Sequence, residues 1–152
     1  MKGRVLLSVL MLALACCSRP SSREYFVMRE NAGYGDTYSF TLDLSDTLLT
    51  YELDFFTRLE RIPFEDFRDD DIILDLRWFS PADSILTDTL VVSISEPVGS
   101  DFFSKDIVTP YDIGGLLDDP GVWRLNAKVV NDSESIRGLG LILNQRKWDT
   151  TN

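Results

Sequence analysis

Residues 49–55, Leu-Thr-Tyr-Glu-Leu-Asp-Phe, decide the fold class because apolar and polar side chains alternate along them. Successive side chains of a β-strand point to opposite faces of a sheet, so this period of two predicts a strand with one buried face. The same alternation occurs just before, at Phe40, Leu42 and Leu44, and Ser45-Asp46 then provides a turn. Residues 40–55 are therefore predicted to form two strands joined by a turn.

The alternation returns four more times along the chain. Further strands are predicted over 72–78, 90–94, 123–129 and 138–143, and turns over 80–83, 118–121 and 131–134. Short strands separated by turns about every 8–12 residues are typical of a β-sandwich. We therefore predict an all-β, immunoglobulin-like or jelly-roll-like sandwich as one domain over residues 36–145.

Two segments interrupt this pattern. Residues 58–71 contain Pro63 and a run of aspartates, and they are expected to form a long connection. Residues 96–117 are rich in Pro and Gly and are expected to be irregular, with short pieces near Ile107-Val108 and Tyr111-Ile113 that pair at a sheet edge.

The N-terminus has the layout of a signal peptide. Lys2 and Arg4 precede an apolar run over 5–15, which is about half of the roughly 20 residues that span a bilayer. Cysteines follow at positions 16 and 17. Small residues leading into a cysteine resemble the lipobox of bacterial lipoproteins, in which the cysteine carries acyl chains such as palmitate.

Either cysteine can be the lipidated one. Cys16 follows Ala15, the better small residue, whereas Cys17 has Leu14 three residues before it, the better apolar residue. We favour Cys16 and keep Cys17 as the alternative. An ordinary secretory peptide would instead leave a free thiol or a strained disulfide between neighbours.

The signal peptide is thus expected over 1–15, and a lipidated cysteine with a flexible, polar tether over 16–35. Residues 146–152 are expected to be a polar tail. No acidic residue occurs between Cys17 and Glu24. Surface-exported lipoproteins often carry acidic residues there, so an outer-membrane lipoprotein facing the periplasm is favoured over a surface-exposed one.

Composition narrows the function. The formal net charge is −10, which argues against nucleic-acid binding because phosphates are neutralised by Lys and Arg. The chain has no histidine, so Ser-His and Cys-His nucleophiles and most zinc sites are excluded. We expect no enzymatic activity, no catalytic residue, no metal site and no cofactor.

Two clusters of side chains are candidate ligand sites. Asp69-Asp70-Asp71 offers oxygen ligands for calcium but lacks EF-hand spacing, so a solvated acidic loop is favoured. Trp78 and Trp123 lie on the apolar phase of their strands and are expected in the core. Tyr111 and Trp148 remain as candidate ligand or partner contacts, and a glycan-binding lipoprotein module is the alternative function.

Several segments resemble the GldH family of gliding-motility lipoproteins. The resemblance rests on Arg58 with Pro63-Phe64 and Asp66-Phe67, on Asp88-Thr89-Leu90 before a strand, on Pro120 to Val129, and on Ile136 to Leu141. Residues 96–117 lack the family's Trp-Leu-Gly segment. The resemblance implies a lipid-anchored, non-catalytic scaffold or adaptor of the cell envelope. Such a protein is held by acyl chains in the membrane, contacts an envelope protein partner, and supports gliding motility or the associated secretion machinery.

Overall fold

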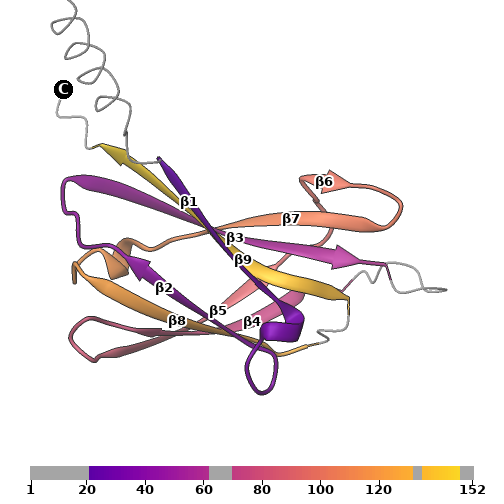
Figure 1. Cartoon of the computed structure of the whole chain (residues 1–152), viewed down its shortest axis with the longest axis horizontal. Coiled ribbons are helices and arrows are strands. Elements are labelled where there is room, and N and C mark those ends of the chain that lie inside the picture. The colour runs from indigo at the N-terminus through magenta and orange to yellow at the C-terminus, as the bar shows by residue number, and fades with distance from the viewer. Residues whose placement is uncertain (1–20, 62–69, 132–134, 148–152) are drawn as a thin grey trace, which may run out of the picture.

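The computed structural model describes residues 21–61, 70–131 and 135–147, which form two antiparallel sheets packed face to face (Figure 1). The five-stranded sheet has the order β1-β9-β3-β7-β6, and the four-stranded sheet has the order β2-β8-β4-β5. The strands are β1 Ser22–Met28, β2 Thr37–Asp43, β3 Leu49–Glu60, β4 Ile72–Phe79, β5 Ile85–Val92, β6 Gly99–Ser100, β7 Ser104–Tyr111, β8 Val122–Val129 and β9 Ile136–Lys147. The predicted all-β sandwich is confirmed.

Short 3₁₀ turns at Arg29–Asn31 and Gly114–Leu116 are the only helical elements in the described ranges. Neither has the length or the apolar character needed to cross a bilayer.

Alternating residues build the core as the sequence pattern predicts. In β3, Tyr51, Leu53 and Phe55 are buried, while Glu52 between them is exposed. Trp78 of β4 and Trp123 of β8 are each 1% exposed, which confirms their expected place in the core. The two sheets thus meet through one continuous apolar layer.

The prediction of a flexible tether over 16–35 is wrong from Ser22 onward. Ser22–Met28 is β1, which pairs with β9 from Ser22 opposite Asn144 to Met28 opposite Gly138. The inner face of β1 is partly covered, whereas its outer face carries the apolar but exposed Phe26 and Met28, so apolar and polar residues do not alternate along the strand. The sandwich therefore begins at Ser22, and β9 extends it to Lys147, two residues into the predicted tail.

Two glycines of β9 allow β1 to pack closely. A Cβ atom at Gly138 would lie 2.5 Å from the backbone oxygen of Val27, and one at Gly140 would lie 2.6 Å from that of Tyr25. The Phe26 ring covers both glycines and meets the Phe56 ring with 5.9 Å between centroids. An aromatic ring over strand glycines replaces the contacts that their missing side chains cannot make.

Within 96–117, the predicted pairing near Ile107-Val108 is confirmed, but the regular structure there is longer than expected. Ser104–Tyr111 is β7, which pairs with β3 along its whole length. Its period of two was hidden because Ile107 is its one fully buried residue. Arg58, expected to lie in a connection, instead lies in β3 and donates two hydrogen bonds to Asp106, at 2.6 and 2.8 Å.

Candidate functional site

Strand β5 is the most exposed long strand of the sandwich. It ends the four-stranded sheet, and β4 is its one neighbour among the described strands. Ile85, Leu86 and Val91 are 56%, 43% and 52% exposed, so apolar side chains face solvent on both sides of this strand. An edge strand of this kind is open to pairing with another chain.

The hydrogen bonds of Thr89 show which backbone groups point to the open edge. Its N–H donates to Oδ1 of Asp88 at 2.7 Å. In an antiparallel pair, alternate residues direct both backbone groups to the same neighbour. Since the Thr89 N–H is turned away from β4, the backbone groups of Thr87 and Val91, which have the same parity, face outward too.

Asp88 lies at the middle of this edge, on the side that faces the other sheet. It pairs with the buried Leu76 of β4, so both side chains share the inner face. The hydroxyl of Tyr111, at the end of β7, donates to Oδ2 of Asp88 at 3.0 Å. The indole Nε1 of Trp78 in turn donates to the Tyr111 hydroxyl at 3.3 Å.

Aromatic packing fixes this chain of three residues. The Tyr111 ring stacks on Trp78 at 5.9 Å with 19° between planes, and it meets Phe55 edge-on at 5.5 Å. Burial raises the pKa of Tyr111 to about 12, so the hydroxyl stays protonated and acts as a donor to the carboxylate. Asp88 is therefore held in place rather than free to turn away from the edge.

The two sheets differ by one strand on this side. At one side of the sandwich β1 contacts β2, and at the other β7 contacts β5. Beyond β7 the larger sheet continues with β6, Gly99–Ser100, whereas the smaller sheet stops at β5. The larger sheet therefore extends one strand further than the smaller sheet on this side. Among the described residues, no strand of the smaller sheet lies opposite β6, next to the edge of β5.

The outer face of the four-stranded sheet carries a second candidate site. An open groove of about 770 Å³ crosses this face. Its lining combines hydroxyl, amide and charged groups from β2, β4, β5 and β8, and contains no aromatic residue: Thr37, Asp75, Leu76, Arg77, Thr87, Asp88, Thr89, Asn126 and Lys128. The polar groups suit hydrogen bonding to a hydrated ligand, but the groove offers no ring on which a sugar would stack.

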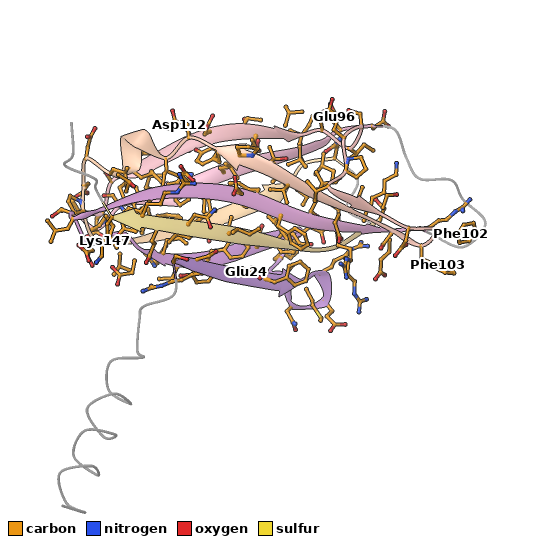
Figure 2. The ribbon with its side chains drawn as sticks, turned by 90° about the horizontal axis from the view of Figure 1, so that it is seen from above. Glu24, Glu96, Phe102, Phe103, Asp112 and Lys147 are labelled. Atoms are coloured by element: carbon orange, nitrogen blue, oxygen red, sulfur yellow. The ribbon has the colours of Figure 1, made fainter. Side chains whose placement is uncertain are left out.

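A third feature is a pair of aromatic rings at the tip of the β6–β7 hairpin. Phe102 and Phe103 are 69% and 72% exposed, and their rings meet edge-on with 5.0 Å between centroids. Figure 2 shows both at one end of the molecule, with Lys147 at the other. The N–H groups of Phe103 and Ser104 donate to Asp101, lower its pKa and fix the turn.

The register places this tip far from the start of β1. Ser22 lies level with Glu52 of β3 through Asn144, and Ser104 lies level with Glu60. The span from Glu52 to Glu60 along β3 is roughly 27 Å at the usual strand rise of about 3.3 Å per residue. The aromatic tip and the N-terminal entry into the sandwich are therefore at opposite ends.

The sequence-predicted sites have different outcomes. Tyr111 is brought to Asp88 and Trp78, half-buried, at the base of the open edge. Cys16, Cys17 and Trp148 lie outside the described residues. In the acidic run, the carboxylate of Asp71 accepts a hydrogen bond from the backbone N–H of Ile94. The described residues contain no group of three His, Cys, Asp or Glu side chains that could hold a metal ion.

Sequence reasoning missed the exposed edge itself. Asp88-Thr89 was expected to precede a strand beginning at Leu90, but β5 begins at Ile85. The signal was present in residues 85–92, Ile-Leu-Thr-Asp-Thr-Leu-Val-Val, where adjacent apolar residues occupy both faces at each end. The exposed Phe102-Phe103 doublet between two polar residues was a second available signal.

Comparison of the chain with protein-family models and with curated protein sequences finds no match.

Proposed function

We propose that this protein is a lipid-anchored, non-enzymatic adaptor of the cell envelope that binds another envelope protein. The observation that carries the proposal is an apolar edge strand, one side of which has no neighbouring strand among the described residues, on a domain preceded by a lipoprotein-like signal. An edge strand gains its missing backbone hydrogen bonds when a partner adds a strand, and this mode of binding requires no catalytic group.

The anchor is Cys16, with Cys17 as the alternative. Acyl chains at one residue supply about 0.8 kcal/mol for each buried methylene, so several chains hold a protein firmly at a bilayer. The membrane is the outer membrane, and the domain faces the periplasm. The start of β1 and the Phe102–Phe103 tip lie at opposite ends of the domain. This supports an anchored domain, because one end can face the membrane while the other end makes contacts away from it.

The resemblance to the GldH family supports a role in gliding motility or the associated secretion machinery. It rests partly on Asp88-Thr89, which lies in the exposed edge, and on Ile136 to Leu141, the first half of β9. Motility is thus the narrower form of the proposal, and an envelope adaptor is the broader one.

Two experiments test the function. Separate Cys16→Ser and Cys17→Ser changes in the full chain are followed by membrane fractionation, and the change at the lipidated cysteine should release the protein from the membrane. If the variant in which both Cys16 and Cys17 are serine also stays in the membrane, the lipid anchor is wrong. Chemical crosslinking of the wild type in intact envelopes should capture a protein partner, and its complete absence would refute the adaptor role.

A glycan-binding module is the second candidate, because of the polar groove on the four-stranded sheet. The burial of Trp78 and Trp123 counts against it, since neither ring is available for stacking on a sugar. A glycan array probed with the purified domain separates the two functions. Specific hits that disappear on Asn126→Ala would favour the glycan module.

A further inference from the structure

We propose that the open edge of β5 binds an extended strand of a partner protein and selects one that presents a lysine or arginine to Asp88. This inference rests on the proposed adaptor function and names the kind of partner that the adaptor binds.

The backbone of β5 offers the hydrogen bonds for an added strand. The outward N–H and C=O groups of Thr87 and Val91 and the outward C=O of Thr89 form one row along the open edge, while the Thr89 N–H already donates to Asp88. The side chains beside this row are apolar at both ends and polar in the middle. An incoming strand would therefore bury apolar side chains against Ile85-Leu86 and Leu90-Val91.

Asp88 sets the charge that the partner must bring. Its carboxylate points inward from the edge, where an added strand would cover it. Covering a carboxylate without a cation is strongly unfavourable because the charge loses its hydration, so a neutral or acidic strand is disfavoured. The Tyr111 hydroxyl holds the carboxylate there but adds no positive charge. A basic side chain on the partner supplies the missing charge, and inward charges on edge strands are known to prevent unselective pairing.

Asp88 also argues against a second copy of this chain as the occupant. Outward groups at odd positions allow only registers that pair odd residues with odd residues. The two longest such registers of β5 with itself set the two Asp88 carboxylates directly opposite each other or on the adjacent diagonal. Like charges in these positions destabilise a strand pair. The partner is therefore a different chain.

The proposal is tested by photocrosslinking in intact envelopes with the full-length protein. A benzophenone amino acid is placed at Thr87 or Thr89, at Thr41 of the opposite edge strand β2 as the matched control, and at Phe103 of the tip. Crosslinks from Thr87 and Thr89, but not from Thr41, should map to an extended partner segment containing a lysine or arginine. The crosslinked yield should fall at least about tenfold with Asp88→Lys. It should fall by less with Asp88→Asn, and a glutamate in place of the partner's basic residue should restore it with Asp88→Lys.

Each result decides between the proposals. Crosslinks from Phe103 or Thr41 alone would overturn the β5 site and leave the adaptor function standing, whereas no crosslink from any position would overturn both. A product of twice the mass of this chain, or a yield unaffected by either change at Asp88, would overturn the selection of a basic partner. Tryptophan fluorescence reports whether each variant is folded. If Asp88→Lys does not fold, two other variants serve instead: Asp88→Asn in this protein, and glutamate in place of the basic residue in the partner. Each of these changes alone should lower the crosslinked yield.

Discussion

Replacement of Phe26 by alanine should destabilise the sandwich by about 2.5 kcal/mol. The ring is 44% exposed, so a little over half of its roughly 200 Å² is buried against Gly138 and Gly140. About 100 Å² of apolar surface at about 25 cal/mol per Å² gives roughly 2.5 kcal/mol. The lost contact with Phe56 adds about 0.5 kcal/mol, and a compact unfolded state subtracts a similar amount.

The measurement is urea unfolding of a soluble form that begins at Ser18, followed by the fluorescence of the buried tryptophans. Glu24→Ala is the matched control, because this residue is on the same strand and the same outer face, and it should change the free energy of unfolding by no more than about 0.5 kcal/mol. Phe26→Leu should retain more than half of the lost stability.

A cost below about 0.5 kcal/mol for Phe26→Ala would refute the reasoning. It would mean that Ser22–Met28 is not an integral strand and that the flexible tether extends as far as the sequence suggested. A double-mutant cycle with Phe56→Ala then isolates the ring pair. Its coupling energy should be about 0.5–1 kcal/mol if the two rings meet as described.

Three further predictions concern single positions. Tyr38→Phe should leave the free energy of unfolding unchanged or raise it by up to about 1 kcal/mol, because the buried hydroxyl has no hydrogen-bond partner among the described residues. Urea unfolding measures this, and a fall of more than about 1 kcal/mol would contradict it. Gly121→Ala should lower the melting temperature, with a cost of about 1–3 kcal/mol, because φ is +156° and the new Cβ would lie 2.5 Å from Cγ of Pro81; an unchanged melting temperature would count against this close approach. The hydrogen bond from Arg58 lowers the pKa of Asp106, so the pair stabilises the fold above the ordinary Asp pKa of about 4, and this contribution is lost as the pH falls below it. When unfolding is measured from about pH 6 to 2, the free energy of unfolding of Asp106→Asn should therefore fall less steeply than that of the wild type. Identical pH profiles of the two proteins would contradict the pair.

The core strands were predictable because one face of each is fully buried. In β3 and β4 the alternation of apolar and polar residues is unbroken from Leu49 to Phe55 and from Leu74 to Trp78, and a one-residue slip would turn the apolar side chains of these stretches outward. The alternation breaks at Phe56-Thr57, which is why the end of β3 was not predicted. The strand β1 was missed because apolar residues lie on both of its faces, and β7 was expected only near Ile107-Val108 because it is partly covered on both faces. Such strands carry apolar and polar residues without a strict order, and sequence periodicity then has nothing to detect.

The candidate site was less predictable for a different reason. Trp78, Asp88 and Tyr111 come from β4, β5 and β7, and their contact depends on how the two sheets stack. No spacing in the sequence encodes that stacking. The sequence offers Tyr111 as a candidate ligand or partner contact, whereas in the structure its hydroxyl donates to Asp88 and its ring stacks on Trp78.

The position of β1 has a consequence for how far the protein extends from a membrane. Since Ser22 is already in the sheet, only residues 17–21 separate a lipidated Cys16 from the folded domain. At a maximum of about 3.5 Å per residue, this leash reaches roughly 20 Å, compared with roughly 70 Å for the twenty residues first expected. The domain would then diffuse in two dimensions at a nearly fixed height. A partner in the same membrane would meet β5 at a high local concentration, while one beyond that height would not be reached.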